Sequence, residues 1–145
     1  MKTAIIYASP HHGNTKKLID AIATKHEVTL IDATQTKDQD LSDYDLIGYA
    51  SGIYFQKYHK SVMEFAKKNT PQGKKIFLMC TFGGKEGHTS MEKILSEKSA
   101  SIVGKYSCKG YDTYGPFKLM GGIAKGHPTD SEIEDAVKFY ESISK

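Results

Sequence analysis

The sequence predicts a doubly wound α/β fold, in which helices cover both faces of a five-stranded parallel sheet of spatial order 2-1-3-4-5. Residues 3–8, 46–50 and 76–81 are short and almost continuously apolar, which indicates strands buried on both faces. Residues 27–30 and 102–108 mix polar and apolar side chains, which is typical of strands at the edges of a sheet. Helical patterns alternate with these strands, and this alternation indicates parallel pairing.

Apolar residues recur at helical spacing in four places between and after the strands. The four stripes are Leu18, Ala21 and Ile22; Val62, Phe65 and Ala66; Met91, Ile94 and Leu95; and Ile133, Ala136, Val137, Tyr140 and Ile143. Capping signatures at residues 89–92 and 129–132 mark the starts of the third and fourth helices. Residues 32–45 form a polar, acid-rich connection in place of a helix, with room for a short helical turn.

The composition is that of an ordinary globular protein. A length of 145 residues predicts one domain, residues 1–145, and 39% hydrophobic with 26% charged residues excludes a disordered or fibrous chain. No apolar stretch approaches the roughly 20 residues of a membrane-spanning helix, and the start shows no cleavage pattern of a signal peptide. Two cysteines without a CxxC motif fit a reducing compartment. We therefore expect a soluble, cytoplasmic protein.

The charge is mildly positive. Lysine plus arginine number 20 against 17 acidic residues, a formal net charge of +3. The basic residues occur as scattered pairs, such as Lys16-Lys17 and Lys74-Lys75, and form no run interleaved with aromatic residues. A nucleic-acid-binding surface is therefore not expected.

The first candidate ligand loop follows the first strand. In a sheet of this order, ligands bind beyond the carboxyl ends of the strands, where the strand order reverses between the first and third strands. Residues 9–15 read Ser-Pro-His-His-Gly-Asn-Thr and lead into the first helix, so hydroxyls, an amide and backbone N–H groups gather at a helix N-terminus. These groups suit a phosphate. The alternative is that Asn14 or Thr15 only caps the helix.

Other phosphate motifs are absent. The first strand is not followed by GxGxxG, which disfavours a dinucleotide site, and no GxxxxGK[ST] occurs, which disfavours a nucleotide triphosphatase. Residues 51–55 and 81–84 form the loops after the third and fourth strands, and each places aromatic or apolar side chains beside glycine. Such loops suit a flat ring, because the backbone can approach its edge while an aromatic side chain covers its face. Ordinary glycine turns with core aromatics are the alternative.

These residues resemble a known family. Tyr7-Ala8-Ser9 followed by Gly13-Asn14-Thr15 resembles the phosphate loop of flavodoxins, and the predicted strand order matches theirs over nearly the whole chain. The resemblance implies FMN as cofactor. It implies that the phosphate is surrounded by Ser9, His11, His12, Gly13, Asn14 and Thr15, and that the isoalloxazine ring is lined by Ser51, Gly52, Ile53, Tyr54, Phe55, Thr81, Phe82, Gly83 and Gly84.

The resemblance also implies a redox role. We expect one- or two-electron transfer between a cytoplasmic reductase and an acceptor, either a protein or a small molecule, with no catalytic side chain and no metal. Flavodoxins are usually acidic and this chain is basic, and residues 50–59 resemble a loop of the flavodoxin-type protoporphyrinogen dehydrogenases. An FMN-dependent oxidoreductase acting on a porphyrinogen or a quinone is therefore one alternative. A phosphate-ligand sensor or a protein-interaction module on the same fold is the other.

The remaining histidines and the two cysteines are not expected to have a catalytic role. Four single histidines lie at helix ends and in loops, where solvated side chains are usual: His26, His59, His88 and His127. Cys80 and Cys108 are expected to be packed thiols and not nucleophiles. Residues 110–128 form a long connection rich in glycine and aromatic residues. It either places Tyr111, Tyr114 or Phe117 at the ligand or a partner, or packs on the sheet edge.

Overall fold

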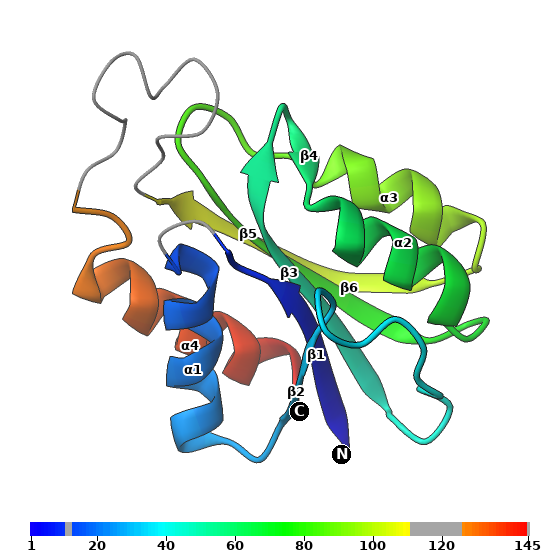
Figure 1. Cartoon of the computed structure of the whole chain (residues 1–145). Coiled ribbons are helices and arrows are strands. Elements are labelled where there is room, and N and C mark those ends of the chain that lie inside the picture. The colour runs from blue at the N-terminus through cyan, green and yellow to red at the C-terminus, as the bar shows by residue number, and fades with distance from the viewer. Residues whose placement is uncertain (11–12, 111–125, 145) are drawn as a thin grey trace.

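The structure is a computed structural model that describes residues 1–10, 13–110 and 126–144. A twisted sheet forms its centre, with helices on both sides (Figure 1). Five strands pair in parallel in the order β2-β1-β3-β5-β6, which confirms the predicted topology. They are β1 (Thr3–Ala8), β2 (Thr29–Asp32), β3 (Leu46–Tyr54), β5 (Lys75–Phe82) and β6 (Ser101–Lys109).

A sixth strand, β4 (Lys57–Tyr58), was not predicted from the sequence. It pairs with the end of β3 as an antiparallel hairpin. Phe55 and Gln56 form its turn, with φ of 50° and 66°. Two residues carry no periodicity, so this strand exists only because the turn brings it back against β3.

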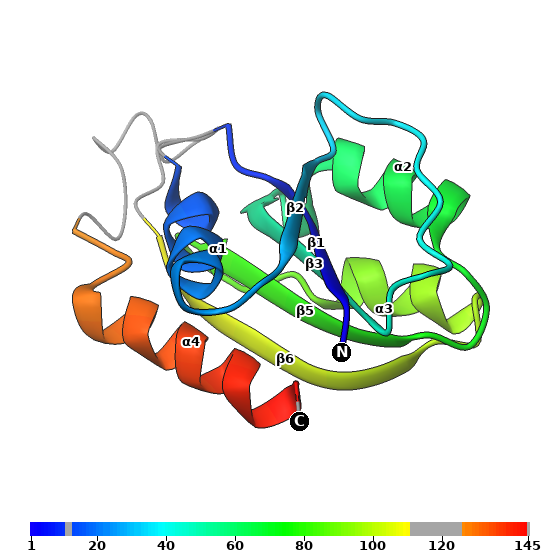
Figure 2. The ribbon, with the colours of Figure 1, turned by 90° about the horizontal axis from the view of Figure 1, so that it is seen from below.

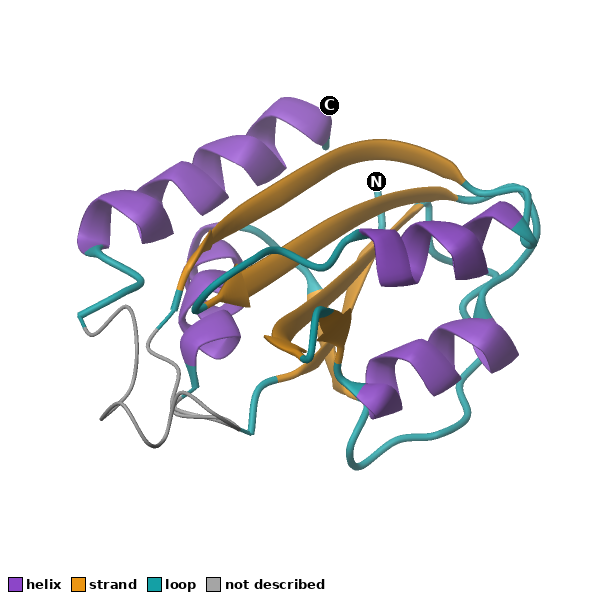
Figure 3. Ribbon diagram, turned by 90° about the horizontal axis from the view of Figure 1, so that it is seen from above, coloured by secondary structure: helices purple, strands orange, loops and turns teal. Residues whose placement is uncertain are grey.

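The helices lie in two pairs on opposite faces of the sheet (Figures 2 and 3). One face carries α1 (Asn14–Lys25) and α4 (Asp130–Ile143), and the other carries α2 (Lys60–Asn69) and α3 (Thr89–Ser96). Each pair covers its own apolar cluster. Ile5, Phe77 and Val137 belong to the cluster under α1 and α4, whereas Ile6, Leu78 and Phe65 belong to the one under α2 and α3.

The strand and helix boundaries differ from prediction in places. The second strand was predicted at residues 27–30 but occupies 29–32, because its pairing with β1 begins at Thr29. Residues 33–45 contain turns and no helix, yet Leu41 within them is fully buried. The capping box predicted at the start of α4 is present, formed by Thr129 and Glu132. Helix α3 begins at Thr89, but its N-cap is His88, which makes no capping hydrogen bond with its side chain.

Gly48 in the middle of β3 shows how tightly the core is packed. A Cβ atom built on Gly48 would lie 2.2 Å from Cζ of Phe77, which is fully buried. The Phe77 ring is itself held by the rings of Phe139 and Tyr140, at centroid distances of 6.2 and 5.8 Å. The strand can therefore carry no side chain at this position unless the aromatic ring moves.

Replacing Gly48 with alanine is expected to lower the free energy of unfolding by about 1–3 kcal/mol, because the new methyl group overlaps the Phe77 ring. Urea denaturation measures the loss. The same substitution in a Phe77→Leu background is expected to cost less, because the smaller side chain frees the space. An equal loss in both backgrounds would show that the clash with Phe77 is not the cause.

Candidate functional site

The candidate site lies at the edge of the sheet where β1, β3 and β5 end. A buried hydrogen bond joins two of the predicted loops there, because the hydroxyls of Thr15 and Thr81 lie 2.9 Å apart. Thr15 is in the first turn of α1 and Thr81 is near the end of β5, and both are almost inaccessible to solvent. The bond therefore fixes the start of α1 over the carboxyl end of the central sheet.

The start of α1 is capped from the preceding loop, by Ser9, and not by its own N-cap residue. Gly13 is the N-cap residue and adopts a left-handed conformation with φ of 65°, and neither Asn14 nor Thr15 occupies the cap position. A Cβ atom built on Gly13 would meet nothing within 4 Å among the described residues. The first turn holds no acidic side chain. The positive end of the helix dipole therefore meets no negative charge from its own first turn, which is a setting that suits an anion.

Ser9 and Asn14 have structural roles around the start of α1. The Ser9 hydroxyl accepts a hydrogen bond from the Lys16 backbone N–H at 3.2 Å, which ties the loop to the helix that follows it. Asn14 packs against the end of β6, because a Cβ atom on Gly110 would lie 2.8 Å from the Asn14 amide nitrogen. His11 and His12, the other two predicted phosphate residues, lie outside the described residues.

The second candidate segment, residues 51–55, was predicted as a loop but continues β3 as far as Tyr54. Ser51 holds this segment to the start of α2. Its hydroxyl accepts a hydrogen bond from the His59 backbone N–H at 2.8 Å and donates one to the Gly52 carbonyl at 2.6 Å. His59 in turn caps α2, since its Nδ1 accepts from the Ser61 backbone N–H at 3.1 Å. The Ser51 hydroxyl therefore positions the hairpin and the start of α2.

Tyr54, Phe55 and Ile53, the predicted ring-lining side chains of residues 51–55, differ in their surroundings. The Tyr54 ring lies edge-on to the His59 ring, with centroids 5.3 Å apart, and its hydroxyl lies close to Gly52. Phe55 at the tip of the hairpin is 68% exposed, which is unusual for a phenylalanine. Ile53, also predicted to line the ring, is 9% exposed and packs in the core under α2 and α3.

The third candidate segment, residues 81–84, brings two glycines and the partly buried ring of Phe82 to this edge of the sheet. Phe82 packs against the core cluster under α2 and α3, and its carbonyl accepts a hydrogen bond from the Gly110 N–H at 2.9 Å. Gly83 is buried and Gly84 is exposed. The end of β6 is therefore attached to the third loop. Residues 111–125, which hold Tyr111, Tyr114 and Phe117, lie outside the described residues.

His88 contradicts the prediction that the single histidines are solvated. Its side chain is 8% exposed, and its Nδ1 lies 2.9 Å from the buried hydroxyl of Tyr58. Burial lowers the pKa of His88. No sequence signal pointed to this, because Tyr58 comes from the unpredicted strand β4. His26 and His127 remain about one-third exposed and pair with Glu141 and Glu132.

Both cysteines are packed thiols, as predicted. Burial raises the pKa of Cys80 and of Cys108 to about 12, so neither is an activated nucleophile in the protein as described.

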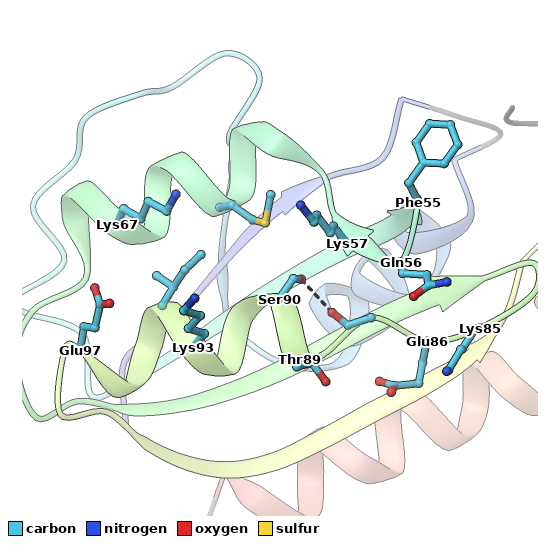
Figure 4. A pocket seen from close by; sticks show the side chains of 13 residues that line it. Phe55, Gln56, Lys57, Lys67, Lys85, Glu86, Thr89, Ser90, Lys93 and Glu97 are labelled. Atoms are coloured by element: carbon cyan, nitrogen blue, oxygen red, sulfur yellow. Dashed lines mark hydrogen bonds between the residues drawn. The ribbon is translucent and has the colours of Figure 1, made fainter.

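A groove of about 870 Å³ runs beside the hairpin and between α2 and α3 (Figure 4). Phe55 lies at its end next to the candidate site. The charged side chains along it are mainly cationic: Lys57, Lys67, Lys85 and Lys93, with Glu86 and Glu97. The groove was not expected from the sequence, because its lysines come from four separate segments.

The comparisons with known proteins agree with the fold. A family model for the flavodoxin domain matches residues 4–115, and the chain belongs to that family. Uncharacterized protein MJ0298 of Methanocaldococcus jannaschii is 40% identical over 149 residues, covering 100% of this chain and 99% of the relative. Within the described residues, no helix has the length and apolar character needed to cross a membrane.

Solved structures share the fold at lower identity. Oxidised flavodoxin 2 from Bacillus cereus is 21% identical with a TM-score of 0.72, covering 99% of this chain and 98% of that one. The Flv1 flavodiiron core from Synechocystis sp. PCC6803 is 20% identical with a TM-score of 0.69, covering 99% of this chain and 36% of that one. A flavodoxin mutant from Fusobacterium nucleatum bound to flavin mononucleotide is 15% identical with a TM-score of 0.64, covering 98% and 96%.

The hydrogen bond between Thr15 and Thr81 can be tested by removing one hydroxyl or both. Thr81→Val is expected to lower the free energy of unfolding by about 1–3 kcal/mol, because it leaves the buried Thr15 hydroxyl without this partner. Adding Thr15→Val is expected to recover part of the loss, since both polar groups are then gone. Urea unfolding of the four variants gives the coupling energy. Losses that simply add would contradict the pairing.

Proposed function

We propose that this chain binds FMN noncovalently at the ends of β1, β3 and β5, and shuttles one or two electrons between a cytoplasmic reductase and an acceptor. The observation that carries the proposal is the glycine-led start of α1, which has no acidic side chain in its first turn and is held over the end of the sheet by Thr15 and Thr81. Membership of the flavodoxin domain family supports it, and so does the FMN-bound state of the similar Fusobacterium nucleatum protein.

The two halves of the site fit the two halves of FMN. The phosphate would lie at the start of α1, where Gly13 leaves room and the helix dipole favours an anion. The isoalloxazine ring would lie between the second and third loops, with Phe55 and Tyr54 to stack on it and Gly83-Gly84 to let the backbone approach its edge. Bound FMN supplies the redox chemistry, and the protein anchors and orients it.

The electron acceptor is proposed to carry negative charge. The groove beside Phe55 has four lysines and two glutamates along it, and the chain as a whole carries a formal charge of +3. Complementary charge speeds the encounter of two redox partners and orients them. An anionic acceptor approaching along the groove would meet the exposed Phe55 end of the site.

Gly13→Val tests the phosphate half of the site, with Gly73→Val as the matched control. Both glycines have positive φ, and in both a Cβ atom meets nothing within 4 Å, but Gly73 lies before β5 at the opposite end of the sheet. The two substitutions should therefore cost similar stability. Only Gly13→Val is expected to weaken FMN binding, by about tenfold or more, or roughly 1.4 kcal/mol.

Flavin fluorescence titration with FMN and with riboflavin provides the measurement. If the start of α1 holds the phosphate, Gly13→Val lowers the affinity for FMN and leaves the affinity for riboflavin, which has no phosphate, nearly unchanged. Equal losses for both flavins would contradict this placement. A wild-type chain that binds neither flavin would overturn the proposed function.

The charge of the groove can be tested with ferricyanide as an anionic acceptor. Lys57→Glu with Lys85→Glu is expected to slow reoxidation of the reduced flavoprotein severalfold at low ionic strength, because it replaces attraction with repulsion. Salt should reduce the difference. Lys25→Glu with Lys138→Glu changes the net charge equally on exposed faces of α1 and α4, and is the control. Stopped-flow absorbance measures the rates, and equal slowing by both pairs would contradict a role for the groove.

A further inference from the structure

A cluster of three metal-ligating side chains lies between the end of β5 and the start of α3. Cys80 on β5, Glu86 in the loop and His88 at the start of α3 each offer one ligand atom, and these atoms lie within 4.8 Å of one another. The His88 Nε2 lies 3.8 Å from the Cys80 sulfur and 3.7 Å from the Glu86 Oε2. We propose that they bind one divalent transition-metal ion of the zinc type, with three protein ligands and one open position.

The distances between the ligand atoms suit such an ion. Zinc binds sulfur at about 2.3 Å, imidazole nitrogen at about 2.0–2.1 Å and carboxylate oxygen at about 2.0–2.2 Å in a tetrahedron. These lengths place neighbouring ligand atoms roughly 3.3–3.6 Å apart. The two distances measured from His88 exceed this range by only a few tenths of an ångström, whereas Cys80 and Glu86 lie within 4.8 Å of each other, so the half-exposed Glu86 side chain has to turn toward the sulfur. Small side-chain rotations would therefore close the site around an ion.

The histidine is already oriented as a ligand. Its Nδ1 is engaged by the Tyr58 hydroxyl at 2.9 Å, so Nε2 is the nitrogen that faces Cys80 and Glu86. Tyr58 is 1% exposed and cannot easily turn away. A hydrogen bond on the second ring nitrogen is the usual companion of a metal-bound histidine, because it fixes the orientation of the ring.

The other two ligands are also held in place. The Glu86 carboxylate accepts a hydrogen bond from the His88 backbone N–H at 3.0 Å. The Cys80 sulfur is fixed on the buried strand β5, 3.8 Å from the His88 Nε2. Gly87 is needed where it stands, because a Cβ atom there would lie 2.8 Å from the Gln56 carbonyl oxygen. The loop therefore closes tightly against the hairpin and keeps Glu86 near the buried pair.

The ligand types select the class of metal. A thiolate and an imidazole favour zinc and similar ions, whereas magnesium and calcium prefer oxygen ligands alone. Binding would release the thiol proton of Cys80 to solvent. The Glu86 side chain is 42% exposed and borders the groove of Figure 4, so an ion can reach the buried sulfur and nitrogen past it. The proposal does not rest on FMN binding.

Titration of the purified full chain with Co²⁺ alone tests the site. Tetrahedral Co²⁺ bound to sulfur is expected to give intense d–d bands at longer wavelength than the absorption of oxidised flavin, saturating at one ion per chain. Zn²⁺ added afterwards is expected to abolish the bands by competition. Because these bands lie outside flavin absorption, the result is independent of whether the chain carries FMN.

Variants distinguish the cluster from adventitious binding. Cys80→Ala is expected to abolish the bands, and Cys108→Ala, which removes the other buried thiol, is expected to leave them unchanged. Glu86→Gln, at a half-exposed position where folding is not at risk, should weaken Co²⁺ binding. Tyr58→Phe, which removes only the partner of Nδ1, should weaken it roughly 10–100-fold.

Three results would overturn the proposal. The first is the absence of d–d bands in a wild-type chain that circular dichroism shows to be folded. The second is bands that survive Cys80→Ala. The third is Co²⁺ affinity that Glu86→Gln and Tyr58→Phe leave unchanged, which would mean that the ion is not held by Glu86 and His88.

Discussion

The parallel register of the three central strands is the constraint on which the rest of this structure depends. Pairing places Ala8 beside Ser51, and Gly52 beside Thr81. Parallel pairing brings all three carboxyl ends to one edge, so loops far apart in the sequence emerge together there. A slip of one residue would turn each buried side chain to the opposite face, so the two apolar clusters hold the register in place.

The hydroxyl groups at this edge stabilise the loops themselves. Ser9 is bonded to the backbone of Lys16, Ser51 to that of His59, and Thr15 to Thr81. Each bond anchors a loop or the start of a helix. The loops are therefore organised by internal hydrogen bonds, and the glycine-led start of α1, the other glycines and the exposed Phe55 border the place of the proposed ligand. A site arranged in advance in this way avoids much of the ordering cost of binding.

The loop between β5 and α3 connects three parts of the molecule. Its first residues border the proposed ring site, and Glu86 faces both the groove and the buried pair of Cys80 and His88. Gly87 packs it against the β3–β4 hairpin. The proposed metal ion would thus join β5 to the start of α3 directly behind the proposed flavin, and would make the position of this loop depend on the occupancy of the metal site.

Much of the fold could be predicted from hydrophobic periodicity, because the central strands and the stripes on α1 to α4 are patterns within a single segment. The candidate site was predicted as three loops at one edge, and the ends of β1, β3 and β5 do meet there, although residues 51–54 and 81–82 continue their strands. The roles of individual side chains could not be predicted. Ser51 and Thr15 act through partners from other segments, and a pattern within one segment carries no information about such partners.

The sequence by itself determined the alternation of strands and helices, the strand order and the capping box of α4. Each of these depends on local backbone preference or on which face of an element is apolar. Only the tertiary structure decided the hairpin strand β4, the burial of His88 against Tyr58, the cluster with Cys80 and Glu86, and the lysine groove. These features arise where segments distant in the sequence pack together, so their energies depend on contacts that exist only in the folded chain.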